Sequence, residues 1–335
     1  MTVMLQKSMR RIVACCKNNS NYHNRIIGVY FSTTKKNNNI NIVEGQKQQN
    51  NNNNIVTNDA LFGCIEKQQD GISFGNLLDA GTGIHSLRWI ASLHQRNLLT
   101  SFTAITADTN MQRKVEEESK NLGIINNHNH NHNHVVVGNW FDDNTNTNHL
   151  IKELPYDQYD TIVADYLIGA MDGYSPYKQD EIIPKLYSLL KPKIGRLYIV
   201  GLEPIPDNDN NDDDDDAGKN LICQVRQIRD ACILLAGHRC YREYPVEWIE
   251  RQIQLLSSSE KIIMEIHKFP ILYRYKTIAS QIDVARRKLP FFPTTEVAKS
   301  MENLLNDLDR QAKELTTTRP IQFGFDYVVS VQRKK

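Results

Sequence analysis

The chain has 335 residues, of which 40% are apolar and 24% are charged, with 16 glycines and 11 prolines. This composition excludes collagen-like and wholly disordered proteins, and the length suffices for one large domain or two small ones. The most apolar run, ACILLAG at 231–237, is far shorter than the roughly 18 residues that a membrane-spanning helix needs. We therefore expect no membrane partner.

The net charge of +1 conceals an uneven distribution. Residues 1–57 carry eight basic side chains and one acid, Glu44, so the rest of the chain is net acidic. An acidic body argues against nucleic acid as a partner. The six cysteines include no CxxC pair and have no regular spacing, which argues against a disulfide framework and leaves a metal site without support.

The first 43 residues contain no Asp or Glu. Read as a helix, they have an apolar face and a basic face, which is typical of a mitochondrial transit peptide, although an unstructured basic tail has the same composition. Residues 37–54 are dominated by Asn and Gln and are predicted to be a disordered linker. We predict that 1–57 is a dispensable targeting segment, with the mitochondrion as destination and the cytoplasm as the alternative, and that the folded domain occupies 58–335.

Two more low-complexity stretches, NNHNHNHNH at 126–134 and DNDNNDDDDDA at 207–217, interrupt this domain. Alternating His residues could bind a metal, but the chain carries polyasparagine elsewhere, so an expanded surface loop is the simpler interpretation. The acidic run lacks the Gly and the terminal Glu of an EF-hand loop. Both stretches mark loops between structural elements.

Short segments rich in β-branched residues alternate with amphipathic segments along the domain. Such segments are typical of parallel strands buried on both faces and of the helices that connect them. The predicted strands are 76–79, 102–108, 135–138, 161–165, 196–201, 261–267 and 323–331. The predicted helices are 84–95, 110–122, 178–190, 220–236 and 246–256. This order predicts an α/β fold with a doubly wound, mainly parallel seven-stranded sheet and an antiparallel last strand.

An inserted helical pair is predicted before the last strand, at about 274–316. Its second helix carries an apolar stripe: Val297, Met301, Leu304, Leu305, Leu308, Ala312 and Leu315. Because the sixth strand is expected to be parallel to the first five, it ends at the edge of the sheet where ligands bind. We interpret the pair as a lid over the acceptor, with a dimerisation arm as the competing interpretation.

The most informative segment is NLLDAGTGIH at 76–85, in which a strand leads through a glycine turn into a helix. Gly81 and Gly83 let a ligand approach the backbone closely at the helix N-terminus. The segment lacks the third glycine of the dinucleotide-binding motif. Asp79 ends the strand, where it would repel a phosphate but not a cationic ligand.

This Asp-x-Gly-x-Gly arrangement resembles motif I of the class I S-adenosylmethionine-dependent methyltransferases, and the resemblance extends from about residue 74 to the end of the chain. It implies that S-adenosyl-L-methionine is the cofactor and that Asp79, Gly81 and Gly83 hold its methionine and ribose parts. It further implies that Asp108, at the end of ITAD, binds the ribose hydroxyls, since one carboxylate can accept both protons.

The resemblance continues through the next three strands. VVVGNWFD offers Asn139 and Trp140 for adenine, at a place where the family more often has Asp. YDTIVAD at 159–165 resembles the fourth-strand motif and adds Asp165 to the implied cofactor contacts. In LLKPKIGRL, Lys193 and the following Ile stand where the family turn commonly has a further glycine.

The loop after the fourth strand supplies the candidates for catalysis. Methyl transfer from a sulfonium chiefly requires alignment of the reacting atoms, and a base is needed only for a protonated acceptor. Asp165, Tyr166, Asp172 and Tyr174 lie at the predicted ligand edge and could contact the acceptor or remove its proton, although half-buried packing is as good an interpretation of the tyrosines.

We therefore expect methyl transfer to a small-molecule or protein acceptor. Two alternatives stay open: an aminopropyltransferase-like enzyme that uses a decarboxylated cofactor, and a non-catalytic protein that keeps the fold for assembly or interaction. The accepting atom, oxygen or nitrogen, and the oligomeric state also stay open.

Overall fold

The computed structural model describes residues 59–107, 109–124, 133–141, 154–207, 217–256 and 262–333. The predicted targeting segment, Asp108 and most of the two low-complexity loops lie outside these residues. The chain divides into two compact units. The sheet unit consists of the described parts of Phe31–Glu203, Glu243–Phe269 and Phe325–Lys335, and the helical unit consists of those of Pro204–Arg242 and Pro270–Gly324.

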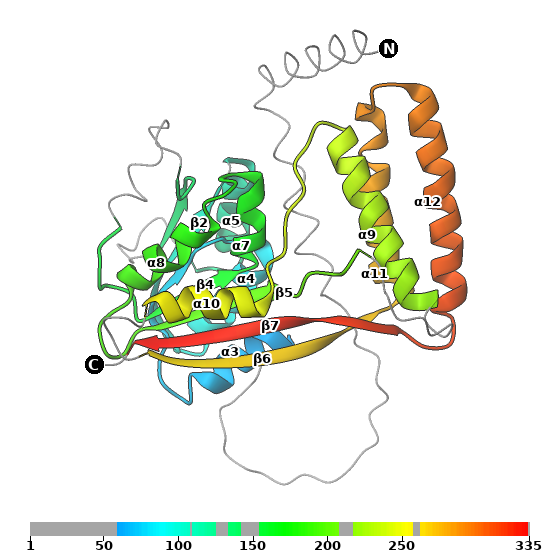
Figure 1. Cartoon of the computed structure of the whole chain (residues 1–335). Coiled ribbons are helices and arrows are strands. Elements are labelled where there is room, and N and C mark those ends of the chain that lie inside the picture. The colour runs from blue at the N-terminus through cyan, green and yellow to red at the C-terminus, as the bar shows by residue number, and fades with distance from the viewer. Residues whose placement is uncertain are drawn as a thin grey trace. The chain divides into compact units, whose positions relative to one another are not determined.

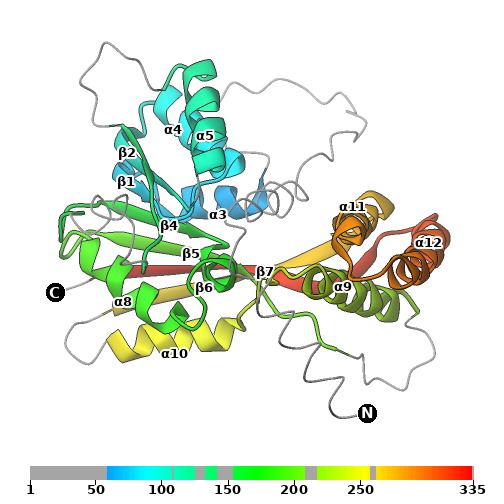
Figure 2. The same ribbon diagram turned by 90° about the horizontal axis from the view of Figure 1, so that it is seen from above.

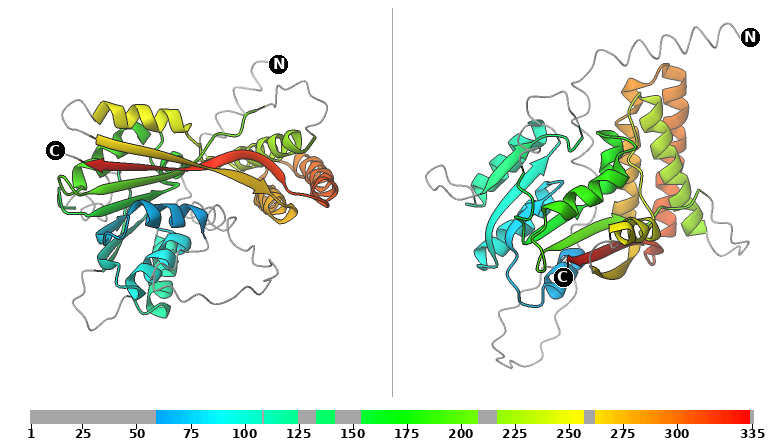
Figure 3. Two further views of the ribbon diagram at one scale, coloured as in Figure 1. Left: turned by 90° about the horizontal axis from the view of Figure 1, so that it is seen from below. Right: turned by 60° about the vertical axis from the view of Figure 1, so that its left-hand side comes forward.

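Within the described residues, the sheet unit is built on seven strands in the order β3-β2-β1-β4-β5-β7-β6 (Figure 1). These strands are β1 (Gly75–Asp79), β2 (Leu99–Thr106), β3 (His134–Val137), β4 (Thr161–Asp165), β5 (Arg196–Leu202), β6 (Ile262–Tyr273) and β7 (Ile321–Arg333). The strands β1 to β5 pair in parallel, whereas β7 is antiparallel to β5. β6 runs opposite to β7 in turn (Figure 3). The predicted mainly parallel sheet with an antiparallel last strand is confirmed.

Helices cover both faces of this sheet (Figure 2). On one face lie α3 (Ala60–Gln68), α4 (Ile84–Gln95) and α5 (Thr109–Asn121), and on the other lie α8 (Gln179–Leu189) and α10 (Val246–Leu256). All five residues of β4 are buried, as expected for a strand enclosed by two layers of helices. The short helix α7 (Leu167–Ala170) and the 3-10 helix η3 (Met171–Gly173) follow β4 at the edge where the parallel strands end.

Helix α3 was not predicted from the sequence. Asp59 caps it by accepting hydrogen bonds from the amides of Leu61 at 2.9 Å and Phe62 at 3.2 Å. Glu66 then accepts a hydrogen bond from Trp89 Nε1 at 2.9 Å and two from the Arg96 guanidinium at 2.8 Å. The bidentate, charge-assisted pair of Glu66 and Arg96 is of a strong type, and it connects α3 to the end of α4.

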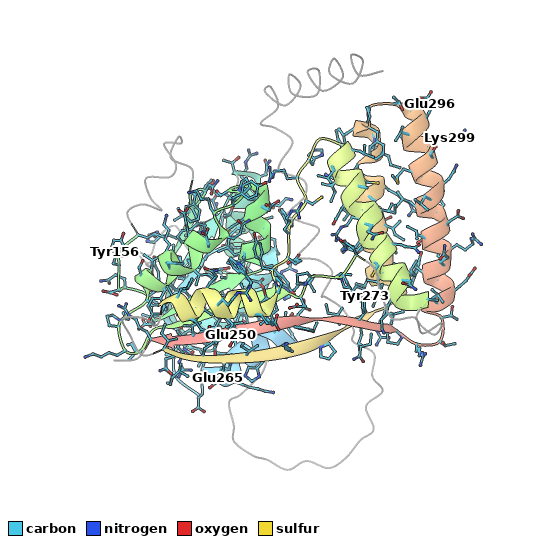
Figure 4. All side chains as sticks on the ribbon, viewed as in Figure 1. Tyr156, Glu250, Glu265, Tyr273, Glu296 and Lys299 are labelled. Atoms are coloured by element: carbon cyan, nitrogen blue, oxygen red, sulfur yellow. The ribbon has the colours of Figure 1, made fainter. Side chains whose placement is uncertain are left out.

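The helical unit contains α9 (Ala217–Leu235), α11 (Tyr275–Arg286), the 3-10 helix η4 (Leu289–Phe291) and α12 (Thr295–Leu315) (Figures 1 and 3). Its apolar core includes Leu221 from α9, Ile278 and Ile282 from α11, and Leu305 from α12. Tyr273, at the end of β6, joins this core (Figure 4). The predicted helical pair is present, and α9 packs with it as a third helix. Whether the pair covers an acceptor stays a prediction.

The predicted apolar stripe of α12 is wider than the face that packs. Leu305, Leu308 and Ala312 are buried, and Met301 packs against the core. The other three members of the predicted stripe are exposed: Val297, Leu304 and Leu315. On a helical period of 3.6 residues these three lie along one edge of the stripe, beyond the line of contact with α9 and α11.

Buried cysteines occur in both units. Cys64 lies on α3 of the sheet unit, and Cys223 and Cys232 lie on α9 of the helical unit. Burial raises the pKa of Cys64 and raises that of Cys232 to about 11. Among the helices described, none has the length and apolarity that crossing a membrane requires.

Candidate functional site

The turn after β1 is held by its neighbouring strands. The amide of Ala80 donates to the carbonyl of Val163 on β4 at 2.8 Å, and the amide of Thr82 donates to Ile105 on β2 at 2.7 Å. Gly83 then begins α4, and its amide donates to the Ser86 hydroxyl at 3.2 Å. The turn therefore has a fixed position at the edge where the parallel strands end.

Gly81 packs closely against a neighbouring side chain, and its backbone angle is not unusual. A β-carbon at position 81 would lie 3.1 Å from Leu167 Cδ1 of α7, which is tighter than ordinary van der Waals contact. The absence of a side chain lets the β1 turn and the α7 segment approach each other.

Asp79 is the most unusual side chain of the site. It is completely buried at the end of β1, and neither carboxyl oxygen has a hydrogen-bond partner among the described residues. Burial raises its pKa to about 6. The Ser86 and Thr82 hydroxyls and the Gly81 amide lie close enough to offset part of this rise, but the two hydroxyls donate to the backbone carbonyls of Gly83 and Asp79 rather than to the carboxyl group. A buried carboxylate without a partner is costly, so this group is suited to a cationic ligand atom.

A second group of acids lies at the same edge. Asp165, which ends β4, is 5% exposed; burial raises its pKa well above the usual value, and the charges of Asp79, Asp59 and Asp326 add to the rise. The next residue, Tyr166, has a left-handed backbone with φ of 49° and donates its hydroxyl proton to Asp326 Oδ1 at 2.8 Å. Of the predicted residues, Asp79, Asp165 and Tyr166 thus share one electrostatic environment.

Asn139 and Trp140 bind other parts of the protein. Asn139 Nδ2 donates to the carbonyl of Tyr174 at 3.0 Å, and its Oδ1 accepts from the Phe141 amide at 3.2 Å and from the Ser175 hydroxyl. Trp140 is 6% exposed and donates from Nε1 to the Ala80 carbonyl at 2.8 Å. Both side chains therefore connect the loop after β3 to its neighbours, and their predicted adenine contacts are a separate, untested role.

The remaining predicted residues lie further along the loop after β4. Asp172 is buried in η3, and the Tyr174 amide donates to the Met171 carbonyl at 3.0 Å. This hydrogen bond helps to hold the loop. Asp108, the predicted ribose ligand, lies outside the described residues.

Sequence reasoning missed two acids of this site. Asp326 lies within β7, and Asp59 precedes α3, where its Oδ2 lies 3.0 Å from His85 Nε2. Neither acid ends a parallel strand, which is where the fold predicts ligand-binding acids. The only sequence signal for Asp326 is an acid within an apolar strand, GFDYVV at 324–329.

No protein-family model and no curated protein matches the chain. Among solved structures, it is similar to a methyltransferase from Geobacter sulfurreducens in complex with S-adenosyl-L-homocysteine, with a TM-score of 0.42 and 12% identity over 85% of this chain and 94% of that one. It is also similar to a Thiobacillus denitrificans methyltransferase in complex with the same ligand, with a TM-score of 0.41 and 12% identity over 84% and 93% of the two chains.

The strand order carries the assignment of the fold. A sheet ordered β3-β2-β1-β4-β5-β7-β6, with β7 antiparallel to β5, is the class I S-adenosylmethionine-dependent methyltransferase fold that the sequence resemblance implied.

Proposed function

We propose that this protein binds S-adenosyl-L-methionine at the β1–α4 turn and catalyses methyl transfer to a small-molecule or protein acceptor. The observation that carries the proposal is the completely buried Asp79, whose two carboxyl oxygens lack partners among the described residues. The ammonium group of the cofactor's methionine part would supply the missing positive charge.

The other residues of the turn fit the same ligand. Gly81 and Gly83 lie at the N-terminus of α4 and carry no side chain that would keep a ligand from the backbone. Asp108, outside the described residues, would bind the ribose hydroxyls. When bound, the cofactor supplies a methyl carbon already activated by the adjacent sulfonium. The protein's own contribution is to position the acceptor and to remove its proton where necessary.

Ligand preference tests this proposal directly. In calorimetric titrations of the full chain, S-adenosylhomocysteine should bind more tightly than methylthioadenosine, which lacks the ammonium-bearing amino-acid part. NADH should bind much more weakly than either, because its phosphates would approach Asp79. Equal affinity for the first two ligands, or preference for NADH, would contradict the proposal.

Turnover separates an enzyme from a non-catalytic protein. Incubation with S-adenosylmethionine carrying a labelled methyl group and a cell extract should transfer the label to an acceptor. Tight binding of S-adenosylhomocysteine without any transfer would favour the non-catalytic alternative.

A further inference from the structure

The antiparallel direction of β7 brings an additional acid to the ligand edge of the sheet. Asp326 pairs in register with Leu202, the last residue of β5, so it lies where the parallel strands end. Tyr166 reaches it from the end of β4: its amide donates to the Val200 carbonyl at 3.0 Å, and its hydroxyl donates to Asp326 Oδ1 at 2.8 Å. Both residues are half-buried at this edge.

The charges around this pair are carboxylates from several elements. Burial raises the pKa of Asp326 to about 6, the Tyr166 hydrogen bond offsets part of the rise, and Asp59 beside α3 adds to it. Burial also raises the pKa of Tyr166 well above its usual value, with further contributions from Asp326, Asp165 at the end of β4 and Glu243 before α10.

Tyr327, the next residue of β7, also lies among acidic side chains. Its pKa is raised by burial and then by Glu243, Glu203, Glu247 and Asp326. Tyr166 therefore stays protonated and donating, while Asp326 is mainly ionised at neutral pH. Such a field stabilises a bound cation and opposes the development of an oxyanion.

Resting on the proposed function, we propose that Asp326, held by Tyr166, binds a basic amine as the methyl acceptor and takes its proton. The acceptor class is thereby an ammonium-bearing molecule rather than an alcohol or a carboxylate. Asp326 is the catalytic residue of this proposal, and Tyr166 is the positioning residue.

The proton and electron balance needs no further reactant. The ammonium N–H bond breaks, its proton goes to the Asp326 carboxylate, and its electron pair stays on nitrogen. The nitrogen lone pair then forms the new N–C bond to the methyl carbon while the C–S pair stays on sulfur, which leaves a neutral thioether. The proton on Asp326 passes to solvent.

Paired probes of equal size but different charge test the acceptor class by binding alone. The full chain, saturated with S-adenosylhomocysteine, is titrated at pH 7.5 with butylamine, benzylamine and spermidine, and with butanol and benzyl alcohol. We expect the amines to bind and the alcohols not to bind. Asp326→Asn should weaken amine binding by about tenfold or more, since it removes a charged partner.

The control variant is Asp70→Asn, which removes an exposed carboxylate at a left-handed position that Asn also tolerates. It should bind amines like the wild type, and both variants should keep the wild-type affinity for S-adenosylhomocysteine, which shows that they are folded. Amines that fail to bind the loaded wild type, or that bind Asp326→Asn equally well, would overturn the inference and leave the proposed function standing. If the wild type does not bind S-adenosylhomocysteine, the proposed function fails and the inference fails with it.

The pH dependence of kcat/KM tests the role of Tyr166. For any amine that the wild type methylates, kcat/KM should fall on acidification through an apparent pKa near 6. Tyr166→Phe removes the hydrogen bond that lowers the pKa of Asp326, so this limb should move to higher pH. Asp326→Asn should abolish the limb, and an unchanged profile in both variants would overturn the assignment.

Discussion

Asp79 at the end of β1 and Asp326 within β7 lie at the same edge of the sheet, the first completely buried and the second half-buried. The pKa of Asp79 and that of Asp326 are both raised to about 6, chiefly by burial. Asp79 has no hydrogen-bond partner among the described residues, whereas Asp326 accepts a hydrogen bond from Tyr166. The first arrangement leaves its oxygens to a ligand, and the second holds a proton acceptor in place.

Asp79→Asn should have the largest effect on ligand binding. Loss of the buried charge should weaken S-adenosylhomocysteine binding by about 100-fold, because a buried charge pair that loses one partner costs roughly 2–5 kcal/mol. The preference over methylthioadenosine should disappear with it. Calorimetry measures both effects, with Asp70→Asn as the matched control. Wild-type affinity in Asp79→Asn would contradict the assignment of Asp79 to the cofactor.

Gly201→Ala should disturb the β7 side alone. A β-carbon there would clash with the Tyr327 hydroxyl, which donates to the Tyr244 carbonyl at 2.8 Å. We expect the free energy of unfolding in urea to fall by about 2 kcal/mol, as overpacked cores do, with little change in S-adenosylhomocysteine affinity.

Gly81→Ala is the matched change on the β1 side. Its new β-carbon would meet only a terminal methyl of Leu167 at 3.1 Å, and this flexible group can shift. The loss should therefore be smaller than for Gly201→Ala. The reverse order of the two losses would mean that the β1 turn is the more rigid region.

Acid titration should reveal both carboxyl groups in the ligand-free protein. Each folded pKa, about 6, lies above the ordinary value of 3.8, so the folded state binds more protons between these values. Protonation of these two carboxyl groups therefore contributes to the free energy of unfolding below pH 3.8, and this contribution is lost as the pH rises to about 6. Asp79→Asn should remove on the order of 2 kcal/mol of this dependence, measured as the difference between wild type and variant in urea unfolding at pH 4 and pH 7. A difference that stays constant across this range would contradict the raised pKa.

Lys193→Gly should have the smallest effect and serves as a reference far from both acids in the chain. Lys193 has a positive φ of 73°, which favours glycine, and it stands where the resembling family commonly has one. Relief of this conformation should stabilise the protein by about 0.5–1 kcal/mol without changing ligand affinity. A lower melting temperature would show that the lysine side chain contributes contacts of its own.

The sequence predicted the parts of the fold whose signal is local. The strand and helix on either side of Asp79 have the expected bounds to within a residue, because a buried strand, a glycine turn and an amphipathic helix each leave a periodic pattern. Helix α3 was not predicted although Asp59 is a local capping residue. Its attachment to α4 depends on Glu66, which bonds to Trp89 and Arg96, residues more than twenty positions away. The role of Asp326 was not predicted because only the pairing of β7 with β5 brings it to Tyr166, 160 residues earlier in the chain.

Each unit contains a buried thiol, so the opening of each unit can be followed separately. Cys64 belongs to the sheet unit and Cys232 to the helical unit, and both are shielded and protonated in the folded protein. An alkylating reagent reacts with the thiolate, so each cysteine should be modified only when its own unit opens. A timed pulse of iodoacetamide followed by peptide mass spectrometry would thus follow two opening rates in one sample. A cofactor bound at the β1 turn should slow modification of Cys64 more than that of Cys232.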